Sequence, residues 1–336
     1  QYVKDTKKLH KCTKDDIMLS RYGYIGQAFI GLEGAYNVAL VKVIKKAEIH
    51  TPYLLCYFQS YYFQHFLLSN VGARATIPGF NKDELENALI RIPEMCEQIE
   101  IASKITKVDE LIGFHKQQLN VLDTLIKSRF IEMFGDPKLN PRKWDMVTIG
   151  DIATDVRYGT SRPATEGGKY PYLRMNNLTY EGHLDLTDLK HIDIPDNEIE
   201  KCVVRNGDVL FNRTNSVELV GKTCVYNLDS DMIIAGYIIR VRIDDRVLPV
   251  ILSSYLNSTV MKEQLRSMAK GAVNQANINA QELRSISIYL PPITLQHEFA
   301  TFVEQVDKSK FYIVQMQILL RLLIRAIQQK TTEVLL

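Results

Sequence analysis

Apolar residues recur at alternating spacings of four and three positions in the stretch between Pro93 and Pro137. The series comprises Ile101, Ile105, Val108, Ile112, Leu119, Leu122, Ile126 and Met133, with His115 and Arg129 at the two remaining positions. Such spacing, sustained over several heptads, predicts a coiled-coil helix. Pro93 suits a first helical turn, and Gly135 followed by Asp136 and Pro137 predicts the end of the helix.

The pattern occurs a second time, because Phe299 stands where Ile101 stood, 198 positions earlier (299 − 101 = 198). The second series comprises Phe299, Val303, Val306, Lys310, Ile313, Gln317, Leu320, Ile324, Ile327 and Thr331. The same shift relates Gln98 to Gln296. One repetition at this long period predicts a duplicated module, since a solenoid would need shorter and more numerous units.

Shorter runs outside the two helices predict a mixture of strands and helices in each copy. Residues 12–48 alternate apolar runs with glycines, as strands and turns do. Tyr, Phe and Leu dominate residues 51–69, and the second copy has a matching segment at 249–268, so we expect one buried helix in each. Strands are expected over residues 88–92, 172–175, 209–211, 223–226, 233–243 and 286–290.

The second copy contains a segment of about 55 residues, 138–192, that has no counterpart in the first copy. The sequence also lacks an initiator methionine, and residue 1 corresponds to about residue 193 of the second copy. We therefore expect the first module to be N-terminally incomplete, either through processing or through truncation. A naturally shortened module stays open as an alternative.

Composition narrows the class of protein without naming a function. Apolar content of 46% and charged content of 24% are ordinary for a soluble globular chain long enough for two cores. No run of eighteen apolar residues and no signal-peptide pattern occurs, so we expect a cytoplasmic protein without a membrane span. Five scattered cysteines without a C-x-x-C pair indicate reduced thiols and argue against a zinc site. The net charge of +2 requires any basic surface to be local.

Motifs for catalysis are incomplete wherever part of one occurs. Gly221-Lys222-Thr223 resembles the end of a phosphate-binding loop, but Ser216 stands where its first glycine belongs, and a strand pattern follows instead of a helix. His297-Glu298 lacks the second histidine of a zinc-protease helix. No glycine-rich cofactor loop was found. We therefore expect no catalytic residue, bound cofactor or metal in this chain by itself.

Polar, aromatic and cationic residues gather instead in several predicted loops. Arg, Asn and Gln side chains make bidentate contacts to base edges, whereas Lys, Ser and Thr suit phosphates. Each such residue singly is more often a solvated loop side chain, but the clustering in one module favours double-stranded DNA as the partner. The candidates are Arg157, Tyr158, Thr160, Ser161, Arg162, Lys169, Arg174, Asn176, Asn177, Arg213, Asn215, Lys222, Asn274, Gln275 and Asn277, preceded in the first module by Arg21, Tyr22, Gln27 and Arg74.

Several of these loops carry a family resemblance. The stretch 271–278, Gly-Ala-Val-Asn-Gln-Ala-Asn-Ile, together with Leu290-Pro291-Pro292 and Gln296, resembles the signature of the specificity (S) subunit of type I restriction-modification enzymes. The stretch 207–213, Gly-Asp-Val-Leu-Phe-Asn-Arg, and the loop 158–161 are similar to that family as well. The first copy departs from the pattern at 74–76, where Arg-Ala-Thr replaces the Asn-Gln pair.

The resemblance implies an α+β fold in which two mixed α/β target-recognition domains, residues 1–93 and 137–291, are joined by two long conserved helices, residues 94–136 and 292–336. These helices would form an antiparallel coiled coil related by the pseudo-twofold internal repeat. Each domain would recognise half of a bipartite DNA target, and the helices would set the spacer. Two methyltransferase (M) subunits, which carry S-adenosylmethionine, and a motor and nuclease (R) subunit are the implied partners.

Two other classes of protein stay open at this point. The chain could be a fragment of a larger single-chain methyltransferase or restriction enzyme whose catalytic domain lies outside this sequence. It could also be a scaffold that uses its coiled coil without a role in DNA binding. Binding to duplex DNA in the presence of a methyltransferase partner separates a DNA reader from a scaffold.

Overall fold

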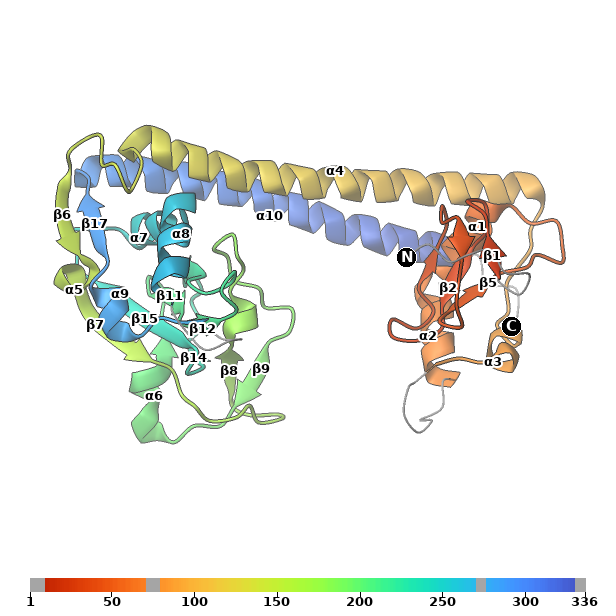
Figure 1. The fold of residues 1–336 in the computed structure, drawn as a ribbon, viewed down its shortest axis with the longest axis horizontal. Helices are drawn as coiled ribbons and strands as arrows, with labels where there is room; N and C mark the ends of the chain where they lie inside the picture. The colour runs from red at the N-terminus through yellow and green to blue at the C-terminus, as the bar shows by residue number, and fades with distance from the viewer. Residues whose placement is uncertain (1–9, 71–78, 270–275, 330–336) are drawn as a thin grey trace. The chain divides into compact units, whose positions relative to one another are not determined.

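The computed structural model describes residues 10–70, 79–269 and 276–329. It divides into two compact units. Unit 1 comprises residues 1–118 and 311–336, and unit 2 comprises residues 119–310. The division passes through both long helices, so each unit contains one part of each helix (Figure 1).

Unit 1 combines short antiparallel strands with short helices that cover them. Strand β2 (Met18–Ser20) lies between β3 (Ala28–Phe29) and β5 (Leu40–Lys42), while β1 (Lys11–Cys12) pairs with β4 (Gly34–Ala35). The helices that follow are α1 (Thr51–Phe58), α2 (Tyr61–Asn70), α3 (Lys82–Glu86) and the first part of α4 (Met95–Phe134). Burial of apolar side chains holds these elements together, and the core comprises Ile17, Leu19, Ala28, Leu54, Tyr57, Phe58, Phe63, Leu67 and Phe80.

Unit 2 contains two four-stranded sheets with helices around them (Figure 1). One sheet has the order β13-β11-β15-β7 and is antiparallel, and the other has the order β10-β14-β8-β9 with β14 parallel to β8. The strands of the first sheet are β7 (Ala153–Tyr158), β11 (Val209–Asn212), β13 (Thr223–Val225) and β15 (Ile238–Ile243). Those of the second are β8 (Tyr170–Leu173), β9 (Lys190–Ile192), β10 (Val203–Val204) and β14 (Met232–Ile234).

Two small strand pairs and several helices complete unit 2. The pairs are β6 (Asp145–Thr148) with β17 (Ser287–Leu290) and β12 (Thr214–Asn215) with β16 (Ala276–Asn277). The helices are α5 (Ile149–Ile152), η1 (Met175–Asn177), α6 (Asp196–Cys202), α7 (Pro249–Asn257), α8 (Thr259–Met268), α9 (Ala280–Arg284) and the first part of α10 (Ile293–Gln329). The buried apolar side chains of unit 2 form separate clusters, one of which includes Phe211 and Ile239 and another Leu210 and Ile234.

The single helix expected in each copy is divided into two. In unit 1, Ser60 separates α1 from α2 and its hydroxyl oxygen accepts a hydrogen bond from the backbone N–H of Phe63, 3.2 Å away. In unit 2, Ser258 separates α7 from α8 and accepts from the N–H of Met261 at 3.3 Å. Serine in this position satisfies an N–H that has no partner in the first turn of a helix, so a new helix starts there. The break recurs at the repeat distance of 198 residues.

Two strand predictions are wrong. Residues 233–243 form β14 and β15, which belong to different sheets, because the chain turns at residues 235–237. Residues 88–92 form no strand, although the matching segment of the second copy is β17. Strand β17 pairs with β6, which lies in the segment 138–192 that has no counterpart in the first copy. A strand needs a second strand to pair with, and none of the described strands of unit 1 pairs with residues 88–92. The carbonyls of Leu89 and Arg91 accept hydrogen bonds from the hydroxyls of Tyr57 and Tyr53 instead.

Buried hydrogen bonds repeat between the units at the same shift as the sequence. The Gln98 amide accepts from His50 N–H at 2.9 Å and donates to Pro93 O at 2.8 Å. The Gln296 amide accepts from Leu248 N–H at 2.9 Å and donates to Pro291 O at 2.8 Å. Capping boxes at α3 and α9 match in the same way. These ties fasten the start of each long helix to the helix pair of its own unit, and they confirm the predicted duplication.

The two long helices pack against each other in both units. In unit 1, Ile101, Ala102 and Ile105 of α4 share a cluster with Ile324 and Ile327 of α10. In unit 2, the rings of Phe130 and Phe134 of α4 lie 5.5 Å from the ring of Phe299 of α10. The beginning of one helix therefore contacts the later part of the other. Ile101, Ile105 and Phe299 of the predicted apolar series are buried, but Ala102, Phe130 and Phe134, which are also buried in these contacts, lie outside that series.

A polar cluster replaces the apolar contact at one seam position of unit 2. Lys310, which is 8% exposed, donates to Asp123 of α4, and its Nζ lies 2.8 Å from Nε2 of His183. His183 Nε2 lies 2.9 Å from the same carboxylate. Burial alone would raise the pKa of Asp123, but hydrogen bonds from His183 and Lys310 outweigh it and lower that pKa. The loop that carries His183 is thereby tied to both helices.

Helix α10 is long and apolar enough, by length and composition alone, to cross a membrane. Its most apolar window has a mean hydropathy of 1.3, and 6% of that window is buried. One such helix is weak evidence for a membrane span. Most apolar side chains between Phe311 and Leu323 of this helix are exposed, whereas Ile324 and Ile327 pack beside α4.

The first testable prediction concerns the repeated glutamine. Gln296→Ala is expected to lower the free energy of unfolding of unit 2 by about 2 kcal/mol, because it leaves Leu248 N–H and Pro291 O without partners in the interior. Urea unfolding, followed by tryptophan fluorescence, measures this free energy. Trp144 is the only tryptophan in the sequence and lies in unit 2, so the signal reports on that unit. Gln305→Ala, an exposed glutamine on the same helix, is the control and should change little. Equal midpoints for the two variants would contradict the structural role.

Candidate functional site

A pocket of about 570 Å³ opens in unit 2 where loops from both sheets meet. The loop after β7 contributes one wall, and the end of β8 with η1 contributes another. Arg213, between β11 and β12, and the turn between β14 and β15 complete it. The lining residues are Thr160, Ser161, Arg162, Pro163, Ala164, Tyr172, Arg174, Met175, Asn176, Arg213, Ala235, Gly236 and Tyr237.

Backbone contacts hold the loop after β7 against the turn at residues 235–237. A Cβ atom at Gly159 would lie 2.1 Å from Ile234 O, so only glycine allows this close approach. Thr160 N–H donates to Ile234 O at 2.9 Å, and Gly236 N–H donates to Thr160 O at 2.7 Å. The turn at residues 235–237 joins a strand of one sheet to a strand of the other, and these hydrogen bonds hold the loop after β7 beside it. The position of this pocket wall therefore depends on that turn.

Three arginines line the pocket, and they differ in their partners. Arg162 makes a two-point ion pair with Glu198, with N···O distances of 2.7 and 3.1 Å. Arg174 pairs with Asp188 at 2.7 Å. Arg213 lies over the ring of Tyr158, 4.8 Å from its centroid, and donates to Gly236 O at 3.4 Å. Among the described residues Arg213 has no carboxylate partner.

The structure brings six of the predicted DNA-binding residues into the pocket wall and a seventh beside it. The six are Thr160, Ser161, Arg162, Arg174, Asn176 and Arg213. Tyr158 supports Arg213 and accepts a hydrogen bond from Ala280 N–H at 2.7 Å. Asn176 and Ser161 are exposed at the rim. Part of the loop grouping inferred from sequence thus lies on one surface feature, and its contact with DNA stays a prediction.

Four other predicted residues have their polar atoms engaged within the unit. Lys222 is 6% exposed and donates to Met175 O at 2.6 Å, and burial lowers its pKa. Asn177 is buried and donates to Asp185 O at 2.8 Å. Asn277 accepts from the Thr214 hydroxyl at 2.9 Å. Asn215 donates to the Asn212 side chain at 3.0 Å. These contacts favour a structural role for all four.

The remaining predicted residues lie away from the pocket or outside the described residues. Lys169 is exposed over the ring of Tyr170, with its Nζ 4.9 Å from the centroid. In unit 1, Arg21 lies over Tyr22 and donates from Nε to Phe80 O at 2.8 Å, while Gln27 is exposed. Arg74, Asn274 and Gln275 lie outside the described residues.

Several lining residues were missed by the sequence analysis. Tyr237, 50% exposed at the pocket, fell inside the wrongly predicted strand 233–243. Gly236 beside it was the available signal, since glycine inside an apolar strand pattern often marks a bend or a close approach. Pro163 and Ala164 carried no comparable signal, because their role follows only from the folded loop.

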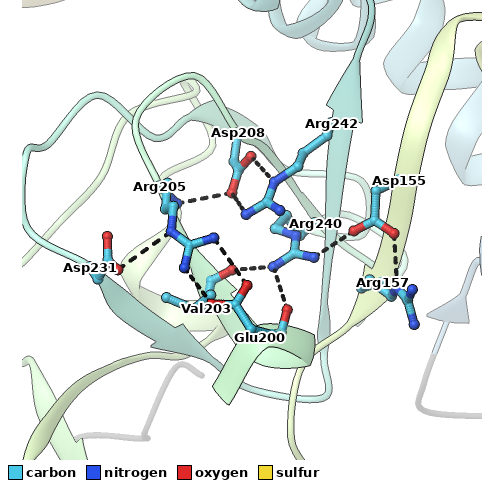
Figure 2. Close-up of polar contacts among 9 residues, drawn as sticks. All are labelled: Asp155, Arg157, Glu200, Val203, Arg205, Asp208, Asp231, Arg240 and Arg242. Carbon is cyan, nitrogen blue, oxygen red and sulfur yellow. Dashed lines mark hydrogen bonds and ion pairs between the residues drawn. The ribbon is translucent and has the colours of Figure 1, made fainter. Parts of the chain in front are cut away.

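Arg157, also predicted to contact DNA, belongs to a charge network beside the sheet (Figure 2). Its Nε donates to Asp155, which also accepts from Arg240 at 2.5 Å. Burial alone would raise the pKa of Asp155, but the hydrogen bonds from Arg157 and Arg240 outweigh it and lower that pKa. Arg157 thus helps to hold Asp155 ionised next to the buried Arg240.

Arg240 is the centre of this network and is 1% exposed. Figure 2 shows its guanidinium pointing between Asp155 of β7 and the carbonyl of Val203 of β10. On the same strand, Arg242 donates to both carboxylate oxygens of Asp208, at 2.8 and 3.2 Å. A buried guanidinium is costly unless its charge is paired. The two Nη atoms of Arg240 have partners in both sheets, while its Nε has no hydrogen-bond partner among the described residues.

The described residues contain no group of three or more His, Cys, Asp or Glu side chains arranged to hold a metal ion. The donors that line the pocket are guanidinium, hydroxyl and amide groups. Groups of this kind bind anions and the hydrogen-bonding edges of polar ligands. The arrangement therefore provides recognition chemistry.

Comparison with known proteins identifies the family to which this chain belongs. A family model described as the type I restriction modification DNA specificity domain matches residues 1–124 and 141–322. The chain therefore belongs to the type I restriction-modification DNA specificity family, and the recognition made from the sequence is confirmed. The two matched segments each cover one copy of the internal repeat.

Individual relatives are similar at low identity. The specificity subunit of type I restriction enzyme EcoKI from Escherichia coli K12 is 24% identical over 255 residues, which are 71% of this chain and 54% of that protein. The putative type I restriction enzyme MjaX specificity subunit of Methanocaldococcus jannaschii is 29% identical over 171 residues, 50% of this chain and 40% of that protein. This chain thus spans about half the length of these curated relatives.

Solved structures share the mixed helix and strand fold. A chain from a type I restriction-modification system, solved to explain complex assembly and conformational transition, has a TM-score of 0.57 at 18% identity, covering 96% of this chain and 82% of that one. The type I system S subunit from M. genitalium has a TM-score of 0.52 at 14% identity, covering 97% and 84%.

The charge network generates the second prediction. Asp155→Ala is expected to lower the free energy of unfolding of unit 2 by about 3 kcal/mol, because it leaves the Arg240 charge buried without its carboxylate. Asp245→Ala is the matched control, because it also removes one negative charge but at an exposed position. It should change the free energy of unfolding little. Urea unfolding at neutral pH measures both.

The same comparison has a pH dependence with a defined direction. A carboxyl whose pKa is lowered in the folded state contributes its full stabilisation above its unfolded-state pKa of about 3.9, and loses it as the pH falls through the folded value. The difference between the wild-type protein and Asp155→Ala should therefore shrink below about pH 4. A difference that stays constant from neutral pH into this acidic range would contradict the assigned ion pair.

Proposed function

We propose that this chain is the DNA sequence-recognition subunit of a type I restriction-modification complex. Residues 1–93 and 137–291 would be two target-recognition domains, each reading one half of a bipartite target, and residues 94–136 and 292–336 the helices that join them. The observation that carries the proposal is the match of the specificity family to both copies of an internally duplicated chain. The helix contacts within each unit support an antiparallel coiled coil.

Recognition by the second module centres on the rim of the pocket. Asn176 is exposed there, and an asparagine amide suits the bidentate contact to adenine in the major groove. Ser161 beside it suits a phosphate or a base edge, and Lys169 suits a phosphate. In the first module, Tyr22 and Gln27 offer a comparable set next to Arg21. Sequence preference comes from the rim groups, because phosphate contacts carry no base information.

Docking of two methyltransferase subunits on the long helices accounts for exposed apolar side chains of α10. In unit 1 this helix exposes Phe311, Tyr312, Val314, Met316, Ile318, Leu319, Leu322 and Leu323. An apolar patch of this kind on a soluble protein is typical of a surface that a partner covers. S-adenosylmethionine would be bound by those partners, and an R subunit would join for restriction. The chain itself would be non-catalytic and cytoplasmic.

Fluorescence anisotropy with labelled duplexes tests the proposal. The full chain with its methyltransferase partner should bind a duplex carrying the methylated genomic site at least about 1,000-fold more tightly than a scrambled duplex. The target sequence comes from mapping methylated adenines in the source genome. Equal binding to both duplexes would favour the scaffold alternative.

The third prediction concerns Asn176. Asn176→Ala should lose discrimination at one base pair of the half-site read by the second module, by about 10- to 100-fold, since a bidentate contact contributes roughly 1–3 kcal/mol. Asn227→Ala, an exposed asparagine that does not line the pocket, serves as the control. Methylation rates on single-base variants of the site provide the measurement. An unchanged preference in Asn176→Ala would remove this residue from the reading face.

The fourth prediction concerns the cofactor. Isothermal titration of S-adenosylmethionine into the isolated full chain should give no binding heat, whereas the complex with methyltransferase subunits should bind it. Saturable binding by the isolated chain would contradict the assignment of the cofactor to the partners. This outcome would favour the alternative of a larger single-chain methyltransferase.

A further inference from the structure

Arg213 is the pocket arginine whose charge has no carboxylate partner among the described residues. The guanidinium groups of Arg162 and Arg174 are neutralised by Glu198 and Asp188. Arg213 makes one long hydrogen bond, 3.4 Å to Gly236 O. The pocket wall therefore keeps one positive charge available for an anionic ligand.

The position of Arg213 is fixed by its surroundings. Its backbone N–H donates to Tyr237 O at 2.9 Å, and its carbonyl accepts from Ile278 N–H at 2.9 Å. The guanidinium lies over the ring of Tyr158, whose hydroxyl is held by Ala280 N–H. Stacking of this kind orients the guanidinium plane and leaves its edges free for hydrogen bonds. Little side-chain entropy remains to be lost when a ligand binds.

Two arginine donors in the pocket are shielded from solvent without an acceptor. The Nε atoms of Arg213 and Arg174 are buried and have no hydrogen-bond partner among the described residues. In unit 1, residues 16–21 (Asp-Ile-Met-Leu-Ser-Arg) match residues 208–213 (Asp-Val-Leu-Phe-Asn-Arg), so Arg21 corresponds to Arg213. The Nε of Arg21 donates to Phe80 O. A buried N–H without an acceptor costs free energy, which an acceptor from a ligand recovers.

The recessed position distinguishes between two kinds of DNA contact. Base edges lie at the floor of a groove about 8.5 Å deep and are reached by groups that project from the protein. Phosphates lie at the outer edge of the duplex and enter a concave site, where arginine binds them bidentately. The apolar side chains of Pro163, Ala164 and Met175 in the same wall suit the deoxyriboses on either side of a phosphate.

We propose that this pocket receives one backbone phosphate of the DNA next to the half-site read by the second module, and that Arg213 is its anchoring residue. This inference rests on the proposed function. It assigns to Arg213 a role in affinity and register, while base discrimination belongs to Asn176 and its neighbours at the rim. Arg174 contributes its Nε donor and remains paired with Asp188.

The experiment measures duplex affinity at several salt concentrations for the full chain with its methyltransferase partner. Arg213→Ala should weaken all duplexes by the same factor and reduce the slope of log affinity against log salt by about 0.9. The loss of affinity between 50 and 200 mM salt should then be about threefold smaller than for the wild-type complex. Arg284→Ala, an exposed arginine outside the pocket, controls for the change in net charge and should leave the slope unchanged.

A methylphosphonate scan locates the phosphate. Replacing each phosphate in turn by a neutral methylphosphonate should reveal one position that weakens the wild-type complex and has no further effect on Arg213→Ala. Arg213→Lys, which keeps the charge, should retain most of the salt slope while losing affinity at that position. Melting temperatures of all variants exclude loss of folding, and the lysine variant keeps the test valid if the alanine variant is unstable.

Three results overturn the inference in different ways. If Arg213→Ala changes preference at one base pair with an unchanged salt slope, Arg213 reads a base. If no methylphosphonate position is coupled to Arg213, the pocket holds no phosphate, while DNA recognition by the chain stands. If the wild-type complex does not prefer its genomic site over scrambled DNA, the proposed function fails and this inference fails with it.

Discussion

The buried guanidinium of Arg240 is the constraint on which the rest of unit 2 depends. It extends from β15 to Asp155 of β7 in its own sheet and to the carbonyl of Val203 in the other sheet. A charge in a nearly solvent-free position cannot be left unpaired without a large cost in free energy. The two sheets must therefore keep one relative arrangement. The pocket forms where the chain passes between those sheets, so the network beside Arg240 supports its walls without lining it.

The sequence was most informative where a local pattern decides the structure. The heptad series predicted both long helices, and the shift of 198 residues related Gln98 to Gln296, whose hydrogen bonds repeat in the structure. It was misleading where an apolar run hides a turn, as at residues 233–243, because periodicity does not show which sheet a buried strand joins. The sequence could not show that Lys222 donates a hydrogen bond to Met175 O, since that contact joins residues 47 positions apart.

The two copies of the repeat share the hydrogen bonds that fix their helices, but they differ in the polar contacts of corresponding loop residues. The glutamine ties and the serine breaks between helices recur, because each supports the junction of a long helix with its own unit. At Arg21 and Arg213 the same motif leads to different outcomes, since Phe80 O accepts from one Nε and no described acceptor is near the other. Repetition of the framework thus leaves the binding chemistry of each unit free to diverge.

The cluster of Asp123, His183 and Lys310 also limits how the second module can be exchanged. His183 comes from the globular part of unit 2, whereas its two partners come from the helices. A chimera could keep both helices and take the globular part from another family member. Asp123 and Lys310 would then lose their contacts with His183 unless the new part supplied a similar side chain. Compatible grafts are therefore those that supply a polar side chain at this position, and the boundaries of an interchangeable cassette include residues on the helices as well as the module.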